Sequence, residues 1–284
     1  MAQLIQMRQR IKAIETIKKV THAMRLISMS SHSRLRHTIE PLGVYRHQVE
    51  SLLSRVRASA PKWTHPLIGI HDRPTSRHLV ILIGSQKGLC GSFNTNLFAR
   101  FAQYRAEYPA KNLSIIAIGK RAVDHAREVA PQQIVEMFPE FNPRTVGEIA
   151  QILTRYISKL AESLGYVDIV SNEFVNFFIQ RPQAHTVVPI VEPETQNMTP
   201  EDYLWEMPSG EVLDMLLEQY LESTLLHFLY QSLLAEQAAR FLSMDNSTRN
   251  AQTLLEDTQL QYNKLRQAII TKELTELAAS FQPY

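Results

Sequence analysis

The chain has 284 residues, of which 44% are hydrophobic and 20% are charged, and its formal net charge at pH 7 is +2. It contains no uninterrupted apolar run of about 18 residues, which excludes a conventional membrane-spanning helix. The single cysteine, Cys90, excludes an internal disulfide and a cysteine-rich metal site, so a reducing compartment is the default expectation.

Glycine and proline are unevenly distributed along the chain. All nine glycines lie between residues 43 and 210, and every proline except Pro283 lies between residues 41 and 208. Because these residues are the strongest breakers of regular structure, the two flanks predict long helices on either side of a compact middle. A C-terminal helix of about 70 residues would be roughly 105 Å long, which exceeds the width of its own domain. It must project, and something else must cover it.

The two flanks also differ in charge. Residues 1–57 contain eleven Lys and Arg against three Asp and Glu, a net charge of +8. Residues 209–284 contain five against ten, a net charge of −5. A basic helix and an acidic helix from opposite ends are natural partners. The attraction favours pairing and register more than stability, since exposed ion pairs contribute about 0–1 kcal/mol each.

The N-terminal flank predicts an amphipathic helix over residues 1–57. Apolar residues recur three or four positions apart, which places them on one stripe of a helix. The pattern continues beyond Pro41 and Gly43, and a kink at this point is compatible with it. The stripe contains Leu4, Met7, Ile11, Ile14, Ile17, Val20, Met24 and Ile27.

The middle of the chain predicts an α/β domain over residues 75–192. Short apolar runs alternate with helical patterns, as in parallel βαβ units. The expected strands cover residues 78–84, 113–119, 134–138, 167–180 and 185–191, and the expected helices cover residues 94–108, 120–129 and 145–164. A polar linker that contains proline follows at 195–208.

The C-terminal flank predicts one helix over residues 209–282. Its first part, 212–242, is apolar on nearly every side, so we expect it to be buried between the middle domain and the N-terminal helix. Farther on, apolar positions alternate in steps of four and three, the spacing of a coiled-coil seam. This seam has few large aliphatic side chains, so a third surface is expected to complete its packing. The seam contains Met244, Thr248, Ala251, Leu255, Thr258, Tyr262, Leu265 and Ile269, and an apolar cluster at the tip contains Ile269, Ile270, Leu274, Leu277 and Phe281.

A glycine-rich loop follows the first expected strand, where phosphate-binding loops occur. Its sequence, GSQKGLCGSFNTN at 84–96, has neither the G-x-G-x-x-G spacing nor a Gly-Lys-Ser/Thr ending. The glycines could simply let the strand turn sharply into a helix, and Cys90 is more typical of a buried small residue than of a nucleophile. A nucleotide-binding α/β enzyme that uses loop 84–94 is therefore the alternative hypothesis.

Other chemistry is not visible in the sequence. The ten histidines are scattered, no H-E-x-x-H motif occurs, and no pair of carboxylates stands out, so we expect no catalytic residue, no metal and no cofactor. The basic N-terminal helix could bind nucleic acid or anionic lipid. It has no aromatic residue before Tyr45 and no known reader motif, so pairing with the acidic helix is preferred.

Four segments resemble signatures of a known family, the gamma subunits of F-type ATP synthases. KVTHAMRLISMSS at 19–31 resembles the N-terminal signature of this family. AARFLSMDNSTRNA at 238–251 and QYNKLRQAIITKELTEL at 261–277 resemble its C-terminal signature, and GLCGSFN at 88–94 resembles an internal one. Length, segment order and the helix–domain–helix plan agree, so the resemblance runs from end to end.

The resemblance implies a non-catalytic rotor subunit. It implies an antiparallel coiled coil of the terminal helices beside a Rossmann-like central α/β domain that binds no nucleotide. The coiled coil would stand inside a ring of alpha and beta subunits, with the catalytic sites on the beta subunits. The part of the subunit outside this ring would contact the epsilon subunit and the c-ring of the membrane sector. The delta subunit is a further expected partner. Rotation of the c-ring would couple ion flow to ATP synthesis or hydrolysis.

The resemblance also implies which residues face the ring. HSRLRH at 32–37 departs from the family by having histidine and serine where lysine is frequent, which alters the ionic contacts expected with the beta subunits. The length and the lack of a transit peptide favour a bacterial form, peripheral on the cytoplasmic face of the plasma (inner) membrane, without direct membrane insertion or nucleic acid. The expected shaft–ring interface contains Met24, Arg25, Arg34, Arg36, Arg266, Gln267, Ile269, Thr271, Glu273 and Leu277.

Overall fold

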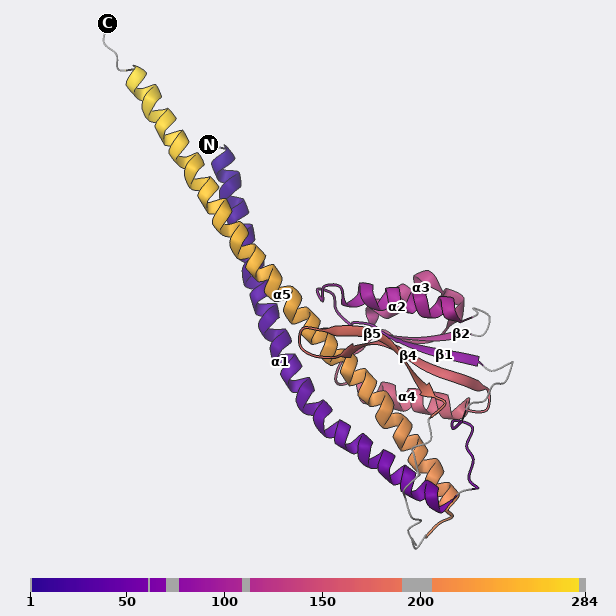
Figure 1. Ribbon diagram of the computed structural model, residues 1–284. Helices are drawn as coiled ribbons and strands as arrows, with labels where there is room; N and C mark the ends of the chain where they lie inside the picture. The colour runs from indigo at the N-terminus through magenta and orange to yellow at the C-terminus, as the bar shows by residue number, and fades with distance from the viewer. Residues whose placement is uncertain (1, 61, 70–76, 109–112, 191–205, 281–284) are drawn as a thin grey trace. The chain divides into compact units, whose positions relative to one another are not determined.

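The computed structural model describes residues 2–60, 62–69, 77–108, 113–190 and 206–280 (Figure 1). The chain divides into two compact units. The helix-pair unit consists of residues 1–29 and 240–284, and the sheet unit consists of residues 30–239.

Two long helices form the flanks of the chain. Helix α1 runs from Ala2 to Ser59, and helix α5 runs from Ser209 to Ser280. At about 1.5 Å per residue they are about 87 and 108 Å long, so the distribution of glycine and proline correctly predicted long helices at both ends. α1 continues through Pro41, which lies inside the helix. Proline removes one helical hydrogen bond, and burial of Leu35, Val49 and Leu53 on either side of it supports the helix there.

The sheet unit is an α/β fold, as predicted. Its five-stranded sheet has the order β3-β2-β1-β4-β5, in which neighbouring strands are parallel except that β5 is antiparallel to β4. The strands are β1 (Arg77–Ile83), β2 (Leu113–Ile118), β3 (Ile134–Phe138), β4 (Leu164–Phe174) and β5 (Gln180–Val188). The shorter helices are α2 (Phe93–Glu107), α3 (Lys120–Val129) and α4 (Val146–Lys159), and a 3₁₀ turn covers Pro131–Gln133.

The last two strands differ from the prediction. The apolar run 167–180 is not one strand, because the chain turns back after Phe174 and β5 begins at Gln180. The side-chain oxygen of Asn176 accepts hydrogen bonds from the amides of Phe178 and Ile179 at 2.9 and 3.0 Å, which fixes the turn. Valine, isoleucine and phenylalanine on both sides of this asparagine concealed the turn in the sequence.

Helices cover both faces of the sheet (Figure 1), and an apolar core lies on each face. On one face, α2 and α3 pack through residues such as Leu97, Phe101 and Val123. On the other face, α4, the first part of α5 and the second part of α1 form a larger cluster. The prediction that the first part of α5 is buried is confirmed for eight leucines: Leu213, Leu216, Leu217, Leu221, Leu225, Leu229, Leu233 and Leu234.

Candidate functional site

In the helix-pair unit, α1 and α5 pack side by side and antiparallel. Arg8 donates a hydrogen bond to the Tyr262 hydroxyl at 3.1 Å, and the nearest charged atoms of Arg25 and Asp245 are 2.6 Å apart. In both pairs the two residue numbers add to 270, which defines a single register over this length. The two ends of the chain therefore form one elongated two-helix structure.

The seam predicted on α5 is confirmed. Each of its positions is buried or half-buried, whereas most positions between them are exposed. Ala251 and Leu255 form an apolar cluster with Ile14 and Ile11 of α1. The buried members of the seam are Met244, Ala251, Leu255 and Thr258, and the half-buried members are Thr248, Tyr262, Leu265 and Ile269.

The stripe predicted on α1 is wrong in its second half. Ile17, Val20 and Ile27 are 55%, 53% and 64% exposed, respectively. Two successive steps of three residues, from Ile14 to Ile17 to Val20, turn the stripe about 120° around the helix and away from α5. Most of the buried or half-buried positions instead keep alternating steps of three and four: Leu4, Met7, Ile11, Ile14, Lys18, Thr21, Arg25 and Ser28. Glu15 and Met24 are half-buried outside this series.

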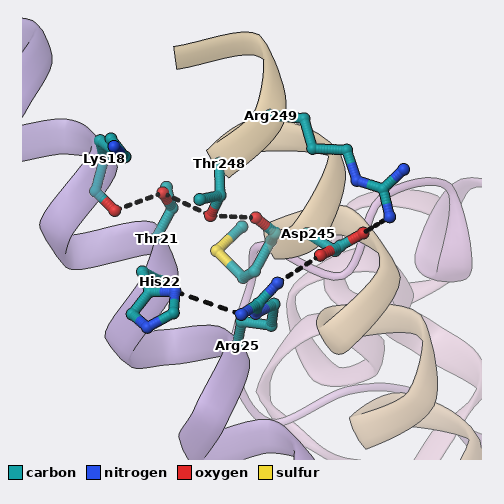
Figure 2. A network of polar contacts seen from close by, with 8 residues as sticks. Lys18, Thr21, His22, Arg25, Asp245, Thr248 and Arg249 are labelled. Atoms are coloured by element: carbon teal, nitrogen blue, oxygen red, sulfur yellow. Dashed lines mark hydrogen bonds and ion pairs between the residues drawn. The ribbon is translucent and has the colours of Figure 1, made fainter. Parts of the chain in front are cut away.

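A polar network occupies the middle of the helix pair (Figure 2). Arg25 pairs with Asp245 at 2.6 Å and lies 3.2 Å from the Nδ1 atom of His22. Asp245 also pairs with Arg249 at 2.8 Å. The hydrogen bond from Arg25 is the main reason that the pKa of the Asp245 carboxyl lies below its usual value. A half-buried ion pair of this kind favours one register over its neighbours.

Next to the ion pair, two threonines face each other across the seam (Figure 2). The hydroxyl oxygens of Thr21 and Thr248 are 2.9 Å apart, and Thr21 donates to the Lys18 carbonyl at 3.1 Å. One turn farther along, the Lys18 ammonium donates to the side chain of Gln252. The polar seam residues of α1 thus have partners on α5, which explains why the apolar pattern alone did not find them.

α1 also carries a second row of apolar residues, on a side that does not face α5. Its members are separated by steps of four, three, four and three residues, which is again the spacing of a coiled-coil seam. The stripe predicted from the sequence combines the first part of the seam with most of this row. The row contains Ala13, Ile17, Val20, Met24 and Ile27.

α5 extends past the N-terminus of α1 (Figure 1). Because facing residue numbers add to 270, residues of α5 beyond about 269 have no counterpart on α1. The tip exposes large apolar side chains, with Ile270, Leu274 and Leu277 exposed by 45%, 61% and 56%. Phe281, the last member of the predicted tip cluster, lies outside the described residues.

Comparison with known proteins decides the family. A family model described as ATP synthase matches residues 3–282. The chain is 31% identical over 281 residues to the ATP synthase gamma chain of Pelotomaculum thermopropionicum, covering 98% of this chain and 97% of the relative. It is also 31% identical over 289 residues to the ATP synthase gamma chain of Herpetosiphon aurantiacus, covering 98% of both. The chain belongs to the ATP synthase gamma-chain family.

Chains in solved ATP synthase structures share the fold. A chain in the OSCP/F1/c-ring structure of Euglena gracilis mitochondrial ATP synthase superposes with a TM-score of 0.68 at 17% identity, covering 98% of this chain and 93% of that one. A chain in the rotor structure of the same enzyme gives 0.63 at 16% identity, covering 95% and 99%. At such low identity, the similarity concerns the fold alone.

The structure distributes the interface residues expected for a gamma chain instead of gathering them in one cluster. Met24 is half-buried and Arg25 belongs to the polar network. Arg266 follows Asp245, the partner of Arg25, by 21 residues on α5, which corresponds to about 32 Å along the axis. Of the other expected interface residues on α5, Ile269 is half-buried. The remaining ones are exposed: Arg266, Gln267, Thr271, Glu273 and Leu277.

Two of the expected interface residues belong to the sheet unit. Arg34 and Arg36 are exposed on the part of α1 beyond residue 29. Arg36 pairs with Glu40 one turn later at 3.1 Å, between two well-exposed side chains, so this pair contributes little to stability. Arg34 donates to the Ser30 hydroxyl over a long distance of 3.4 Å.

Two backbone amides at the start of the glycine-rich loop donate hydrogen bonds to side chains of the same chain. The amide of Ser85 donates to the Asn94 side chain at 3.2 Å, and the amide of Gln86 donates to the Glu236 carboxylate at 3.2 Å. Glu236 is only 2% exposed. A buried carboxylate and a side-chain amide thus occupy the positions that a phosphate would need, which argues against the alternative hypothesis of a nucleotide site here.

Within the described ranges of the chain, no group of three or more His, Cys, Asp and Glu side chains is arranged to hold a metal ion. Among the described helices, none is both long enough and apolar enough to span a bilayer.

Removing the central ion pair should loosen the helix pair locally. For Arg25→Ala or Asp245→Ala we expect the free energy of local opening to fall by about 1–2 kcal/mol. Asp245→Ala removes the carboxylate that pairs with the partly buried Arg25, and Arg25→Ala leaves Asp245 paired with Arg249, whose side chain is well exposed. Hydrogen exchange of the amides of residues 244–256 in the full chain measures this opening. The double variant should lose no more than the larger single loss. Arg10→Ala, at an exposed position of the same helix, is the control and should change little.

Proposed function

We propose that this chain is the central rotor stalk of an F-type ATP synthase and couples ion flow through a membrane sector to ATP synthesis or hydrolysis in a ring of alpha and beta subunits. Membership of the gamma-chain family supports this role. The observation that carries it is the tip of α5, where Ile270, Leu274 and Leu277 are well exposed beyond the end of α1. Such a row of large apolar side chains is typical of a surface that another protein covers.

The surfaces that would face the ring are the tip of α5 and the second apolar row of α1. Apolar contacts are non-directional, so they can hold a shaft in place while opposing its rotation only weakly. The charged and polar residues on the same helices would contact a given beta subunit in only some rotational positions of the shaft. Our proposed interface keeps Met24, Arg25, Arg34, Arg36, Arg266, Gln267, Ile269, Thr271, Glu273 and Leu277.

One structural neighbour belongs to an assembly of OSCP, F1 and a c-ring. By analogy we propose an F1 ring and a c-ring as partners here, together with epsilon and delta subunits. In this assembly the chain is non-catalytic and peripheral, on the cytoplasmic face of a bacterial inner membrane. We propose three functional parts: shaft helices at 1–57 and 209–282, and a central Rossmann-like α/β domain at 75–192.

Reconstitution tests the role directly. The purified full chain should hydrolyse no ATP, whereas its addition to the alpha and beta subunits encoded with it should yield a stable complex with ATPase activity. Alpha and beta subunits without the chain serve as the control. Robust hydrolysis by the chain alone, or failure to join alpha and beta subunits that assemble with another gamma chain, would rule the proposal out.

A charge in the second apolar row should uncouple the motor. Met24→Lys places an ammonium group between Val20 and Ile27, where contact with the ring would remove its water. We expect several-fold slower ion-driven ATP synthesis in membrane vesicles, with the complex still assembled. Val129→Lys, at a 42% exposed valine of α3, is the matched control. If both variants synthesise ATP at the wild-type rate, the second row does not contact the ring.

A further inference from the structure

A cavity of about 430 Å³ opens on the sheet unit. It is lined by the part of α1 near Leu35, the turn that precedes α4, and the part of α5 near Leu233. Leu35 and Leu233 are both buried and form an apolar floor together with Pro143. This volume falls within the range of about 300–1,000 Å³ that is usual for small-molecule sites. The polar lining consists of Ser31, Arg34, Thr38, Asn142, Arg144 and Gln237.

The charge of this lining is entirely positive. Arg34 and Arg144 are its charged members, and neither Asp nor Glu lines the cavity. Among the described residues, neither guanidinium has an ion-pair partner, although most of the acidic side chains in the chain are described. Two arginines beside the same cavity without a carboxylate attract an anion, and the planar guanidinium suits a carboxylate particularly well.

Arg144 lies on a turn that hydrogen bonds hold in place. The backbone amide of Arg144 donates to the side-chain oxygen of Asn142 at 2.9 Å, and the backbone amide of Asn142 donates to the Thr145 hydroxyl at 3.1 Å. The oxygen of the Asn142 amide group is thereby used, while its nitrogen has no partner among the described residues and remains a donor on the cavity lining. A fixed donor beside two cations favours binding, because little ordering is needed when a ligand arrives.

We propose that this cavity binds a small amphipathic anion, a carboxylate attached to a short aliphatic chain. Arg34 and Arg144 would hold the carboxylate, and Leu35 and Leu233 would contact the chain. An inorganic anion would leave the apolar floor uncovered, and an uncharged chain would leave both arginines unpaired. All of its residues belong to the sheet unit. The site shares Arg34 with the proposed shaft–ring interface, so ligand binding is measured on the chain alone, without the ring.

Calorimetry on the full chain tests the site with three probes: octanoate, 1-octanol and acetate. Octanoate should bind at least about tenfold more tightly than either of the others, because only octanoate satisfies both the floor and the arginines. Equal binding of octanoate and 1-octanol would overturn the assignment, and so would equal binding of octanoate and acetate.

Two variants locate the binding. Arg144→Gln should weaken octanoate binding about tenfold, the effect usual for loss of one charge-assisted contact. Arg127→Gln removes an exposed arginine of α3 outside the cavity and should leave the affinity unchanged. Arg144 is itself exposed, so both proteins should fold, which their circular dichroism spectra verify. Octanoate affinity that is equal in the wild type and in Arg144→Gln refutes the site.

Discussion

Gly119→Ala should lower the free energy of unfolding of the sheet unit by at least about 3 kcal/mol. Gly119 lies between β2 and α3 with φ of +88°, a conformation that alanine adopts only with strain. A Cβ atom at this position would lie 2.4 Å from the carbonyl oxygen of Gly84 and 3.0 Å from its carbonyl carbon. Both atoms belong to the backbone, so the end of a buried strand would have to move. Urea unfolding of the full chain, followed by circular dichroism, measures the loss.

The matched control, Gly147→Ala, should change stability in the opposite direction. Gly147 lies in the first turn of α4, and a Cβ atom there would meet nothing within 4 Å. Gly147→Ala should therefore stabilise the protein by up to about 1 kcal/mol, since alanine favours the helix and restricts the unfolded chain. If the two variants unfold at the same urea concentration, the close approach at Gly119 does not determine stability.

The same contact explains what the glycine-rich loop does. A Cβ atom on Gly84 would lie 2.9 Å from both the Cβ and the backbone nitrogen of Ala122 in α3. Gly84 and Gly119 thus allow the ends of two strands and the start of α3 to pack closely. Phosphate-binding loops use glycine for the same reason, a close backbone approach, so the local sequence could not separate the two functions. What separates them is Glu236, which comes from α5, 150 residues farther along the chain than Gln86.

The helix-pair unit shows the limit of reading periodicity. On α5 the apolar spacing gave the seam correctly, because the residues that face away from α1 are mostly polar. On α1 the seam continues through Lys18, Thr21 and Arg25, while isoleucine and valine lie on the second row. A search for apolar residues alone therefore continues along the second row and leaves the seam. The polar seam residues become recognisable only when their partners on α5 are known, and these lie more than 200 residues away in the sequence.

The element types followed from the sequence more readily than their ends did. Strands β1 and β2 are buried on both faces and read as continuous apolar runs, which a short window identifies. The hairpin between β4 and β5 was missed because Asn176 is the single polar residue between Phe174 and Ile179. The expected interface residues came from resemblance rather than from physics, since exposed side chains such as Arg266 and Glu273 have no packing signal of their own.

Loss of Asp168 should strongly disturb the interior of the sheet unit. It lies on β4, is 3% exposed, and accepts a hydrogen bond from the Tyr104 hydroxyl at 2.5 Å. The same carboxylate oxygen lies 2.8 Å from the Nε2 atom of His78 on β1. Burial by itself raises the pKa of Asp168. The hydrogen bonds from His78, Thr186 and Tyr104 outweigh this effect, so the pKa lies below its usual value.

Asp168→Ala should lower the free energy of unfolding by about 3 kcal/mol, because it removes the buried acceptor that His78 and Tyr104 share. The Tyr104 hydroxyl and the His78 Nε2 atom, 2.7 Å apart, are then left to pair with each other. For a protein of this size the thermal midpoint should fall by roughly 10 °C. Thermal unfolding of the full chain gives the value. Asp124→Ala, which removes an exposed aspartate from α3, is the matched control and should stay within about 0.5 kcal/mol of the wild type.

The pH dependence distinguishes lost charge from lost shape. Since folding lowers the pKa of Asp168, its ionised form stabilises the protein above the unfolded-state pKa of about 3.8, and this contribution is lost as the pH falls through the lower folded-state value. Asp168→Asn keeps the shape of the side chain and removes the charge. The stability difference between the wild type and this variant should therefore be constant at neutral pH and shrink below about pH 4. Equal stabilities of the wild type and Asp168→Asn at neutral pH would mean that the carboxylate stabilises this unit through its shape and not through its charge.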